Sequence, residues 1–284
     1  MSLTNGLPEH VGVYGGGRMG AGIAHAFLLA GATVTVVEAS EPAAAAARAR
    51  VEASLRTARE RGKLAGSLAD VAARLTVATA PAALAGCGLV VEAVPEDTAL
   101  KRRVLATVAE VAPTARLATN TSSLSVDALA SGVPVPDRLI GLHFFNPVPA
   151  SELVEIVVGT KTAPDLVGDA RAWVDALGKT SVTVTDSPGF ASSRLGVALA
   201  LEAMRMLQDG VACAEDIDTA MTLGYKHPMG PLRTTDVVGL DVRLAIAEHL
   251  ARELGERFEP PAVLREKVAA GHLGRKTGQG FYTW

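Results

Sequence analysis

Two kinds of segment alternate along the first two thirds of this 284-residue chain, and this alternation limits the possible folds more than any other feature. Short runs rich in Val, Leu and Thr, such as 33–37, have the composition of buried strands. Longer helix-forming stretches lie between them, such as 42–62, which has Pro42 at its start. Such alternation builds βαβ units, so the sequence predicts an α/β fold with a mostly parallel sheet covered on both faces.

The individual elements follow from the same patterns. Strands are expected at 11–14, 33–37, 75–78, 89–92, 117–120, 139–143, 153–157 and 181–184. Helices are expected between several of them, at 19–30, 42–62, 99–111 and 166–177.

The pattern changes after residues 185–189, where the β-branched runs stop. The remaining chain has helical periodicity. Its expected helices are 194–208, 214–223, 240–254 and 262–270. We therefore predict two domains, an α/β domain over 1–186 and an all-helical domain over 187–284.

A glycine-rich turn follows the first predicted strand. Residues 15–20 read Gly-Gly-Gly-Arg-Met-Gly and fit the pattern G-x-G-x-x-G between a strand and a helix. Gly15 permits the tight turn, Gly17 lets a diphosphate approach the backbone, and Gly20 lets the helix pack closely on the strand. The helix N-terminus also offers N–H groups and partial positive charge to phosphates. The predicted dinucleotide-binding residues of this turn are Gly15, Gly17, Arg18, Met19 and Gly20.

An acidic residue specifies which dinucleotide is expected. Glu38 ends the second predicted strand, 18 residues after Gly20. A carboxylate there accepts hydrogen bonds from both ribose hydroxyls of NAD and repels the 2′-phosphate of NADP. Arg18 and Ser40 lie nearby and leave room for the phosphorylated form. The sequence favours NAD as the cofactor.

Polar residues end several later strands, where ligands bind in open α/β sheets. Asn120 ends the strand that begins at Leu117, Ser122 follows it, and His143 ends the strand that begins at Leu139. Glu155 lies 12 residues beyond His143 inside the apolar run Leu-Val-Glu-Ile-Val, where an unpaired carboxylate would be costly. A carboxylate against the imidazole would fix its tautomer and make it a competent general base.

Composition excludes several other classes of protein. The net charge of -3 lacks the basic footprint of a nucleic-acid-binding protein. Cys87 and Cys213 lie far apart without ligand spacing, so neither a disulfide scaffold nor a metal site is expected. No secretory signal or membrane-length apolar run is visible. The expected location is the cytoplasm, with no membrane partner and both thiols reduced.

Together the motifs resemble the L-3-hydroxyacyl-CoA dehydrogenase family, which includes the short bacterial 3-hydroxybutyryl-CoA dehydrogenases. The resemblance covers nearly the whole chain in the family's order. The stretches that carry it are GGGRMGAGIA, VVEAVPED, NTSSLS, GLHFFNPVP, LVEIV, DSPGF, EDIDTAM, HPMGPL and GRKTGQGFY. The resemblance implies a Rossmann-like N-terminal domain, a helical C-terminal domain that dimerises, and NAD-dependent oxidation of a 3-hydroxyacyl-CoA to the 3-ketoacyl-CoA.

The same resemblance assigns roles near the reaction centre. His143 matches the family's catalytic base and Glu155 its orienting carboxylate. Ser122 matches a serine that contacts both the substrate oxygen and the cofactor, and Asn146 matches a substrate contact. The family's contacts near the nicotinamide half of NAD fall at Glu96, Lys101, Asn120 and Lys276.

Coenzyme A contacts are expected on the long helix over 42–62. The resemblance places Ser54 and Arg61 where the family has a Ser and a Lys against coenzyme A. Arg61 keeps the positive charge that a phosphate needs, with a planar fork in place of a point charge.

The sequence departs from the family pattern at three places. Ser193 stands where the family has an Asn that helps to position the substrate, and serine is shorter but keeps a donor and an acceptor. The turn before Glu155 reads Ala150-Ser151-Glu152 in place of Val-Met-Lys, and the segment around Arg61 carries few basic groups. A water bridge or a different substrate would accommodate Ser193.

These departures leave alternatives to a short-chain acyl-CoA substrate such as 3-hydroxybutyryl-CoA. Weaker basic recognition would fit the same chemistry on a hydroxyacyl group carried by an acyl carrier protein, whose phosphopantetheine lacks the adenosine phosphates. A free hydroxy acid is a third substrate class, against which the stretch His-Phe-Phe-Asn-Pro-Val-Pro argues. A non-catalytic NAD-binding protein is the alternative outside enzymes.

Overall fold

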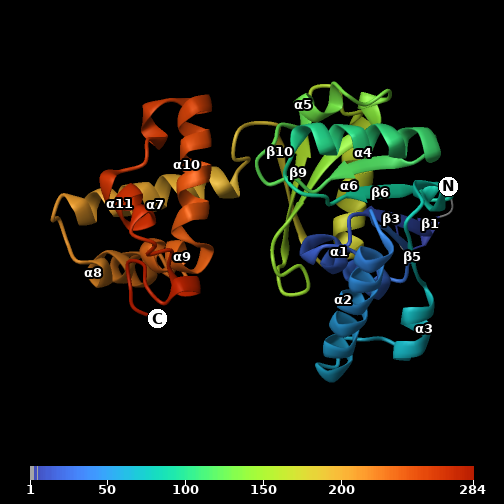
Figure 1. Ribbon diagram of the computed structural model, residues 1–284, viewed down its shortest axis with the longest axis horizontal. Coiled ribbons are helices and arrows are strands. Elements are labelled where there is room, and N and C mark those ends of the chain that lie inside the picture. The colour runs from blue at the N-terminus through green and yellow to red at the C-terminus, as the bar shows by residue number, and fades with distance from the viewer. Residues whose placement is uncertain (1–2, 5) are drawn as a thin grey trace. The chain divides into compact units, whose positions relative to one another are not determined.

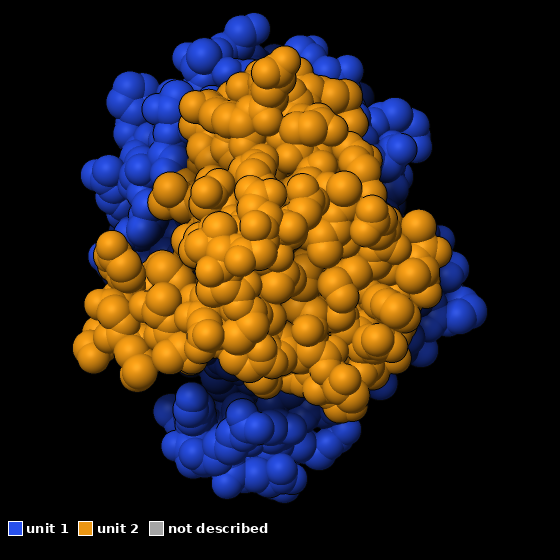
Figure 2. All heavy atoms as spheres, turned by 90° about the vertical axis from the view of Figure 1, so that its left-hand side faces the viewer, with its two compact units in different colours: residues 1–187 blue, residues 188–284 orange. Residues whose placement is uncertain are grey.

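The computed structural model describes residues 3–4 and 6–284. It divides the chain into two compact units, residues 1–187 and 188–284, one residue from the predicted boundary. Figure 2 shows the two units in separate colours.

An eight-stranded sheet forms the centre of the first unit, with strand order β10-β9-β8-β7-β6-β3-β4-β5. Its strands are β3 (His10–Tyr14), β4 (Thr33–Val37), β5 (Leu75–Ala78), β6 (Leu89–Glu92), β7 (Arg116–Thr119), β8 (Leu139–Phe144), β9 (Leu153–Val158) and β10 (Thr180–Thr185). Neighbouring strands run parallel except at β8 and β9, which pair antiparallel. The predicted mostly parallel α/β sheet is confirmed. A separate two-stranded sheet joins β1 (Leu3–Thr4) to β2 (Leu7–Pro8).

Helices cover both faces of this sheet, as Figure 1 shows. They are α1 (Arg18–Leu29), α2 (Glu41–Glu60), α3 (Leu68–Ala73), α4 (Thr98–Val111), α5 (Val126–Ala130) and α6 (Pro164–Ala176), with 3-10 turns η1 (Pro81–Leu84) and η2 (Pro136–Arg138). The sequence did not predict α3 and α5, which are only 6 and 5 residues long. Helices this short have little periodicity to detect, and Ser67 and Ser125 cap them locally.

One large apolar core joins the sheet to α1, α2 and α6. Alternate residues of several strands face it, for example Val11 and Val13 of β3, because successive side chains point to opposite faces of a sheet. Trp173 of α6 is the largest fully buried side chain.

The strand order places a ligand site at a definite edge. The chain moves from β3 to β4 on one side, whereas β6 lies on the other side of β3. Crossovers on opposite sides leave a crevice at the carboxyl ends of β3 and β6, where open α/β sheets bind ligands. The glycine-rich turn follows β3 at this point.

The second unit is entirely helical among its described residues. Its helices are α7 (Ser192–Gln208), α8 (Ala214–Thr219), α9 (Pro231–Val238), α10 (Leu240–Leu254) and α11 (Ala262–Ala269), with a π-helical turn η3 (Ala220–Gly224) and 3-10 turns η4 (Glu256–Phe258) and η5 (Arg275–Thr277). A second apolar core, separate from the first, includes Leu201, Met204 and Leu250.

Helix α9 was not predicted from the sequence. Its middle carries Thr234, Thr235 and Val237, which have modest helix propensity. Its N-terminus is capped from a distance, because the Asp218 carboxylate accepts hydrogen bonds from the N–H groups of Leu232 and Arg233 at 2.9 Å each. A capping residue 13 positions before the helix gives no local start signal.

Within the described residues, no helix is both long and apolar enough to cross a membrane. Cys87 is buried, which raises the pKa of its thiol to about 11, and Cys213 is exposed; both are free thiols.

Candidate active site

The glycine-rich turn has the geometry of a phosphate cradle. Gly15 has φ +97°, and a Cβ atom there would lie 2.9 Å from the carbonyl oxygen of Ala93. A Cβ on Gly20 would lie 1.7 Å from the carbonyl oxygen of Gly15. At Gly17, the N-cap of α1, a Cβ would meet no described atom within 4 Å outside its chain neighbours, and no described side chain caps the helix. A diphosphate therefore fits against the helix N-terminus.

Glu38 lies directly beside this turn at the end of β4. Its Oε1 accepts a hydrogen bond from the Gly16 N–H at 2.6 Å, and Oε2 accepts one from the Ala39 N–H at 3.2 Å. A carboxylate has further lone pairs after these bonds, so it can still accept ribose hydroxyls. Arg18 is exposed and Met19 half-buried at the start of α1.

A buried ion-pair cluster lies at the end of β6. The Lys101 side chain has no exposed surface, and its Nζ lies 2.8 Å from Glu92 Oε1 and 3.3 Å from Glu96 Oε2. Glu92 also accepts hydrogen bonds from the Val94 N–H and the Thr119 hydroxyl. The buried Lys101 side chain thus fixes the loop after β6 through its ion pairs with Glu92 and Glu96.

Glu96 links this cluster to the polar turn after β7. Its Oε1 accepts hydrogen bonds from the Thr121 hydroxyl at 2.6 Å and from the N–H groups of Ser122 and Ser123 at 2.9 and 3.0 Å. Burial raises the pKa of Glu96, but these bonds and the Lys101 cation outweigh burial and lower the pKa overall. Glu96 is therefore held as an anion that fixes the backbone of the exposed Ser122.

Asn120 connects the same turn to β8. Its Oδ1 accepts a hydrogen bond from the Phe144 N–H at 2.9 Å, next to His143 in the chain. Since β7 and β8 are parallel neighbours, Asn120, Ser122 and His143 come to the same edge of the sheet.

His143 and Glu155 form a buried pair across two antiparallel strands. The register of β8 and β9 sets them directly opposite each other, and 2.8 Å separates His143 Nδ1 from Glu155 Oε2. Their exposed fractions are 6% and 1%. With Nδ1–H donating to the carboxylate, Nε2 becomes the basic nitrogen of the neutral ring. The Phe145 ring lies against the imidazole, with ring centroids 4.4 Å apart.

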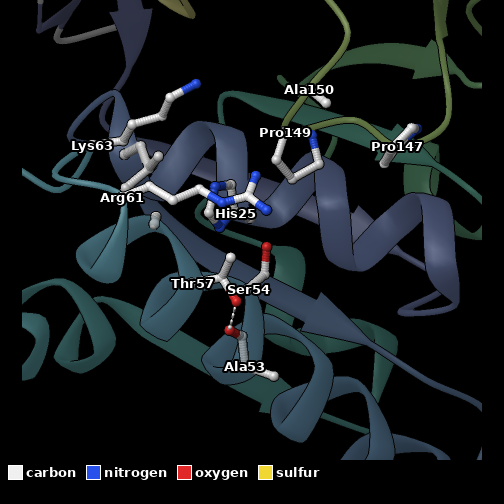
Figure 3. Close-up of a pocket in the computed structure, with 11 residues that line it drawn as sticks. His25, Ala53, Ser54, Thr57, Arg61, Lys63, Pro147, Pro149 and Ala150 are labelled. Atoms are coloured by element: carbon white, nitrogen blue, oxygen red, sulfur yellow. Dashed lines mark hydrogen bonds between the residues drawn. The ribbon is translucent and has the colours of Figure 1, made fainter.

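A groove runs between α1, α2 and the segment 146–150, and we call it the α1–α2 groove. It consists of three adjoining cavities of about 410, 390 and 280 Å³ that share lining residues. The first is lined by Asn146, Arg18 and Ser54, and the second by Ser54 and Arg61. Figure 3 shows the second cavity, with Ser54 from α2, Arg61 directly after that helix, and the two prolines of the segment on its wall. Three predicted substrate contacts thus line one continuous groove.

Ser193 and Lys276 lie in the second unit. Ser193 is in the first turn of α7 and is half-buried. Lys276 is in η5, where its Nζ lies 2.6 Å from both carboxylate oxygens of Asp241 and lowers the pKa of that carboxyl through this hydrogen bond.

Sequence reasoning did not single out Glu92 and Thr121, although both organise the site. The signal for Glu92 was present, because it is an acidic residue at the end of the apolar run Leu-Val-Val-Glu. That is the same signal that identified Glu155. Thr121 gave no such signal, since its role depends on the position of Glu96 in space. No group of three or more metal-binding side chains was found in the described part of the chain.

Comparison with known proteins gives matches over nearly the full length of this chain. Residues 10–187 match the family model for the 3-hydroxyacyl-CoA dehydrogenase NAD binding domain, and residues 189–284 match the model for the C-terminal domain of the same family. The chain is 42% identical to a 3-hydroxybutyryl-CoA dehydrogenase of Mycobacterium tuberculosis, over 97% of this chain and 98% of that protein. It is 39% identical to a probable 3-hydroxybutyryl-CoA dehydrogenase of Deinococcus radiodurans, over 96% and 99%. The crystal structure of (S)-3-hydroxybutyryl-CoA dehydrogenase PaaH1 from Ralstonia eutropha superposes with a TM-score of 0.93 at 38% identity, covering 98% of this chain and 99% of that one.

Proposed function

This chain belongs to the 3-hydroxyacyl-CoA dehydrogenase family, and from that premise we propose that its substrate is a short-chain L-3-hydroxyacyl-CoA, such as 3-hydroxybutyryl-CoA. The protein is an NAD-dependent 3-hydroxyacyl-CoA dehydrogenase. Relatives named for the hydroxybutyryl substrate match nearly the whole chain, which supports the short acyl group. The observation that carries the proposal is the buried His143–Glu155 pair at the ligand-binding edge of the sheet.

His143 is the proposed general base. Its Nε2 would take the proton of the substrate 3-hydroxyl, and the resulting imidazolium would be stabilised by Glu155 at 2.8 Å from Nδ1. Because Glu155 is almost fully buried, little water screens this interaction. The pair can release the proton again for the reverse reduction.

NAD fits the residues present at the glycine-rich turn. Gly15, Gly17 and Gly20, with the N-terminus of α1, would hold its diphosphate, and Glu38 its adenosine ribose. When bound, NAD supplies the hydride acceptor. Glu96, fixed by Lys101, would orient the turn that carries Asn120 and Ser122 toward the nicotinamide and the substrate oxygen. Two observations favour this arrangement: a Cβ on Gly20 would lie 1.7 Å from the Gly15 carbonyl oxygen, so the turn packs tightly on the start of α1, and the space beside Gly17 is open.

The coenzyme A part of the substrate is proposed to occupy the α1–α2 groove. Asn146 would contact the acyl end, Ser54 the middle and Arg61 a phosphate. The roles of Ser193 toward the substrate and Lys276 toward NAD rest on the family resemblance.

Formation of NADH from 3-hydroxybutyryl-CoA and NAD is the direct test of this function. We expect kcat/KM for the CoA thioester to exceed that for the same acyl group on an acyl carrier protein, because Arg61 offers a cation to a phosphate that the carrier arm lacks. A higher kcat/KM for the carrier thioester would assign the enzyme to carrier-bound substrates. NAD binding without turnover of either thioester would contradict the catalytic proposal.

Glutamine in place of Glu38 is expected to reduce the preference for NAD over NADP by about 10- to 100-fold in kcat/KM, the range for one or two charge-assisted hydrogen bonds. The amide keeps an oxygen for the Gly16 N–H, so the turn stays in place, whereas the charge that repels a 2′-phosphate is lost. The measurement is kcat/KM with each cofactor. Equal values for NAD and NADP in the unmodified enzyme would contradict the role given to Glu38.

We also propose a cytoplasmic homodimer assembled through the helical unit. Eight of the nine large apolar side chains that are exposed in the described chain lie in residues 188–284, including Leu195, Leu223 and Tyr225 at 70%, 67% and 76%. Exposed apolar surface of this kind marks an interaction face. A molar mass near 29.2 kDa in solution would contradict the dimer.

A further inference from the structure

His25 is a buried polar residue that the mechanism leaves without a role. It lies in the middle of α1 and is 3% exposed. Its Nδ1 is buried and forms no hydrogen bond with any described residue. Burial and the nearby Lys179 cation lower its pKa to about 4, so the ring is neutral at physiological pH. A neutral imidazole carries one N–H donor and one acceptor nitrogen.

The ring lies on the wall of the α1–α2 groove. It lines both the 390 Å³ cavity that contains Ser54 and Arg61 and the 280 Å³ cavity that contains Lys179. Figure 3 shows His25 among the residues that line this cavity, with the Arg61 side chain reaching across the ring in this view. A polar side chain whose Nδ1 lacks a partner therefore lies beside a space large enough for a ligand.

The two ends of the α1–α2 groove differ in the residues that line them. At one end lies Asn146, three residues after His143 in the chain, in a cavity that Arg18 and Arg50 also line beside the glycine-rich turn. At the other end lie Arg61 and Lys63, for which no ion pair is found within residues 3–4 and 6–284, and Lys179 follows beyond them. Burial lowers the pKa of Lys179, the nearby Glu152 carboxylate raises it, and Lys63 lies close enough to lower it further. The acyl end of a thioester would therefore lie near Asn146 and its phosphates near the cations at the other end.

The wall opposite α2 is held rigidly near His25. Val148 is buried against Gly22, where a Cβ would lie 2.8 Å from the Val148 Cβ. Lys179 donates hydrogen bonds to the carbonyl oxygens of Val148 and Ser151. A group seated between these walls would meet the imidazole without a rearrangement of the segment.

We propose that His25 is a specificity-determining residue that hydrogen-bonds an amide of the pantetheine arm of the CoA thioester. The proposal rests on the function proposed above. Between an acyl group at Asn146 and phosphates at Arg61, the arm offers secondary amides, each with one N–H and one carbonyl oxygen. These match the donor and acceptor of a neutral imidazole. A phosphate, by contrast, would favour a charged ring.

The test measures the NADH-dependent reduction of acetoacetyl-CoA and of acetoacetyl-pantetheine. Leucine in place of His25 is expected to raise KM about five- to tenfold for both substrates and to leave kcat unchanged, because one neutral hydrogen bond to the substrate is lost. Glutamine at the same position keeps a hydrogen-bond donor and an acceptor, so KM is expected to return most of the way to that of the unmodified enzyme. His10→Leu is the matched control, because it makes the same exchange at an exposed histidine at the start of β3 that lines none of the three cavities of the groove. This control is expected to leave both KM values unchanged.

Three results would overturn the proposal. If His25→Leu raises KM for acetoacetyl-CoA alone, His25 contacts the phosphates and not the pantetheine arm. If kcat falls while KM is unchanged, His25 has a structural role and does not bind the substrate. An unchanged KM would remove the contact altogether. Stability provides a separate readout, since we expect the leucine variant to have an unchanged or higher Tm and a smaller Tm increase with acetoacetyl-CoA.

Failure of the proposed function gives a different pattern. If the unmodified enzyme does not reduce acetoacetyl-CoA, calorimetric binding of this thioester to the unmodified and leucine forms decides the role of His25. Binding weakened by His25→Leu would support it, and equal binding or none would overturn it.

Discussion

Alanine in place of His143 is expected to lower kcat for NADH formation from 3-hydroxybutyryl-CoA by about 10²- to 10⁴-fold, the contribution typical of a positioned general base. The reason is the geometry of the pair, in which a buried carboxylate 2.8 Å from Nδ1 makes Nε2 the proton acceptor. Binding of NAD, measured by calorimetry, is expected to remain unchanged, because the proposed diphosphate and ribose contacts lie at Gly15, Gly17 and Glu38.

Two companion variants separate catalysis from general damage. His10 is exposed at the start of β3, and His10→Ala is expected to keep the full rate. Glu155→Gln keeps a polar partner for the ring but removes the carboxylate charge that would stabilise the imidazolium, so kcat should fall, though by less than in His143→Ala. A His143→Ala enzyme that stays within fivefold of the original rate would exclude His143 as the base.

Methionine in place of Lys101 is expected to destabilise the first unit by about 3–5 kcal/mol, the range for removing one partner of a buried ion pair. Glu92 is 1% exposed, and without Lys101 it would remain buried as an uncompensated anion near Glu96. At about 2–4 °C per kcal/mol for a unit of this size, Tm should fall by about 6–20 °C in a thermal melt.

The matched control for this loss is a surface pair of the same type. Arg48 lies 3.9 Å from Glu52, and the two side chains are 44% and 38% exposed, so Arg48→Met should cost less than about 1 kcal/mol. Adding Glu92→Gln to Lys101→Met should recover part of the stability, because the stranded charge is then neutral. Similar melting temperatures for the two single variants would show that the buried cluster contributes no more than a surface pair.

Features encoded by neighbouring residues could be predicted from the sequence. The glycine turn at 15–20 is formed by adjacent residues, and each strand can be recognised from the composition of its own short run. Glu155 lies inside the apolar run Leu-Val-Glu-Ile-Val, which predicted that its carboxylate has a partner, and the structure places Glu155 opposite His143.

Features made by distant residues could not be predicted. Helix α9 depends on a cap from Asp218, and the position of Ser122 depends on Glu96 from another loop. The family pattern predicted that Lys101 lies near the nicotinamide half of NAD, and only the packing of α4 on β6 shows that its side chain has no exposed surface. The surroundings of His25 likewise come from α1, α2 and a loop more than 80 residues further along.

The antiparallel pairing of β8 and β9 has a consequence for the engineering and evolution of this enzyme. Sheet register, not the connecting segment, fixes His143 opposite Glu155, and a slip of one residue would move Glu155 to the other face. The connecting segment, which lines the groove at Pro147, Pro149 and Ala150, can therefore vary in sequence without disturbing the proton-transfer pair. A combinatorial library confined to positions 149–152 should alter which thioesters are accepted while leaving the chemical step intact.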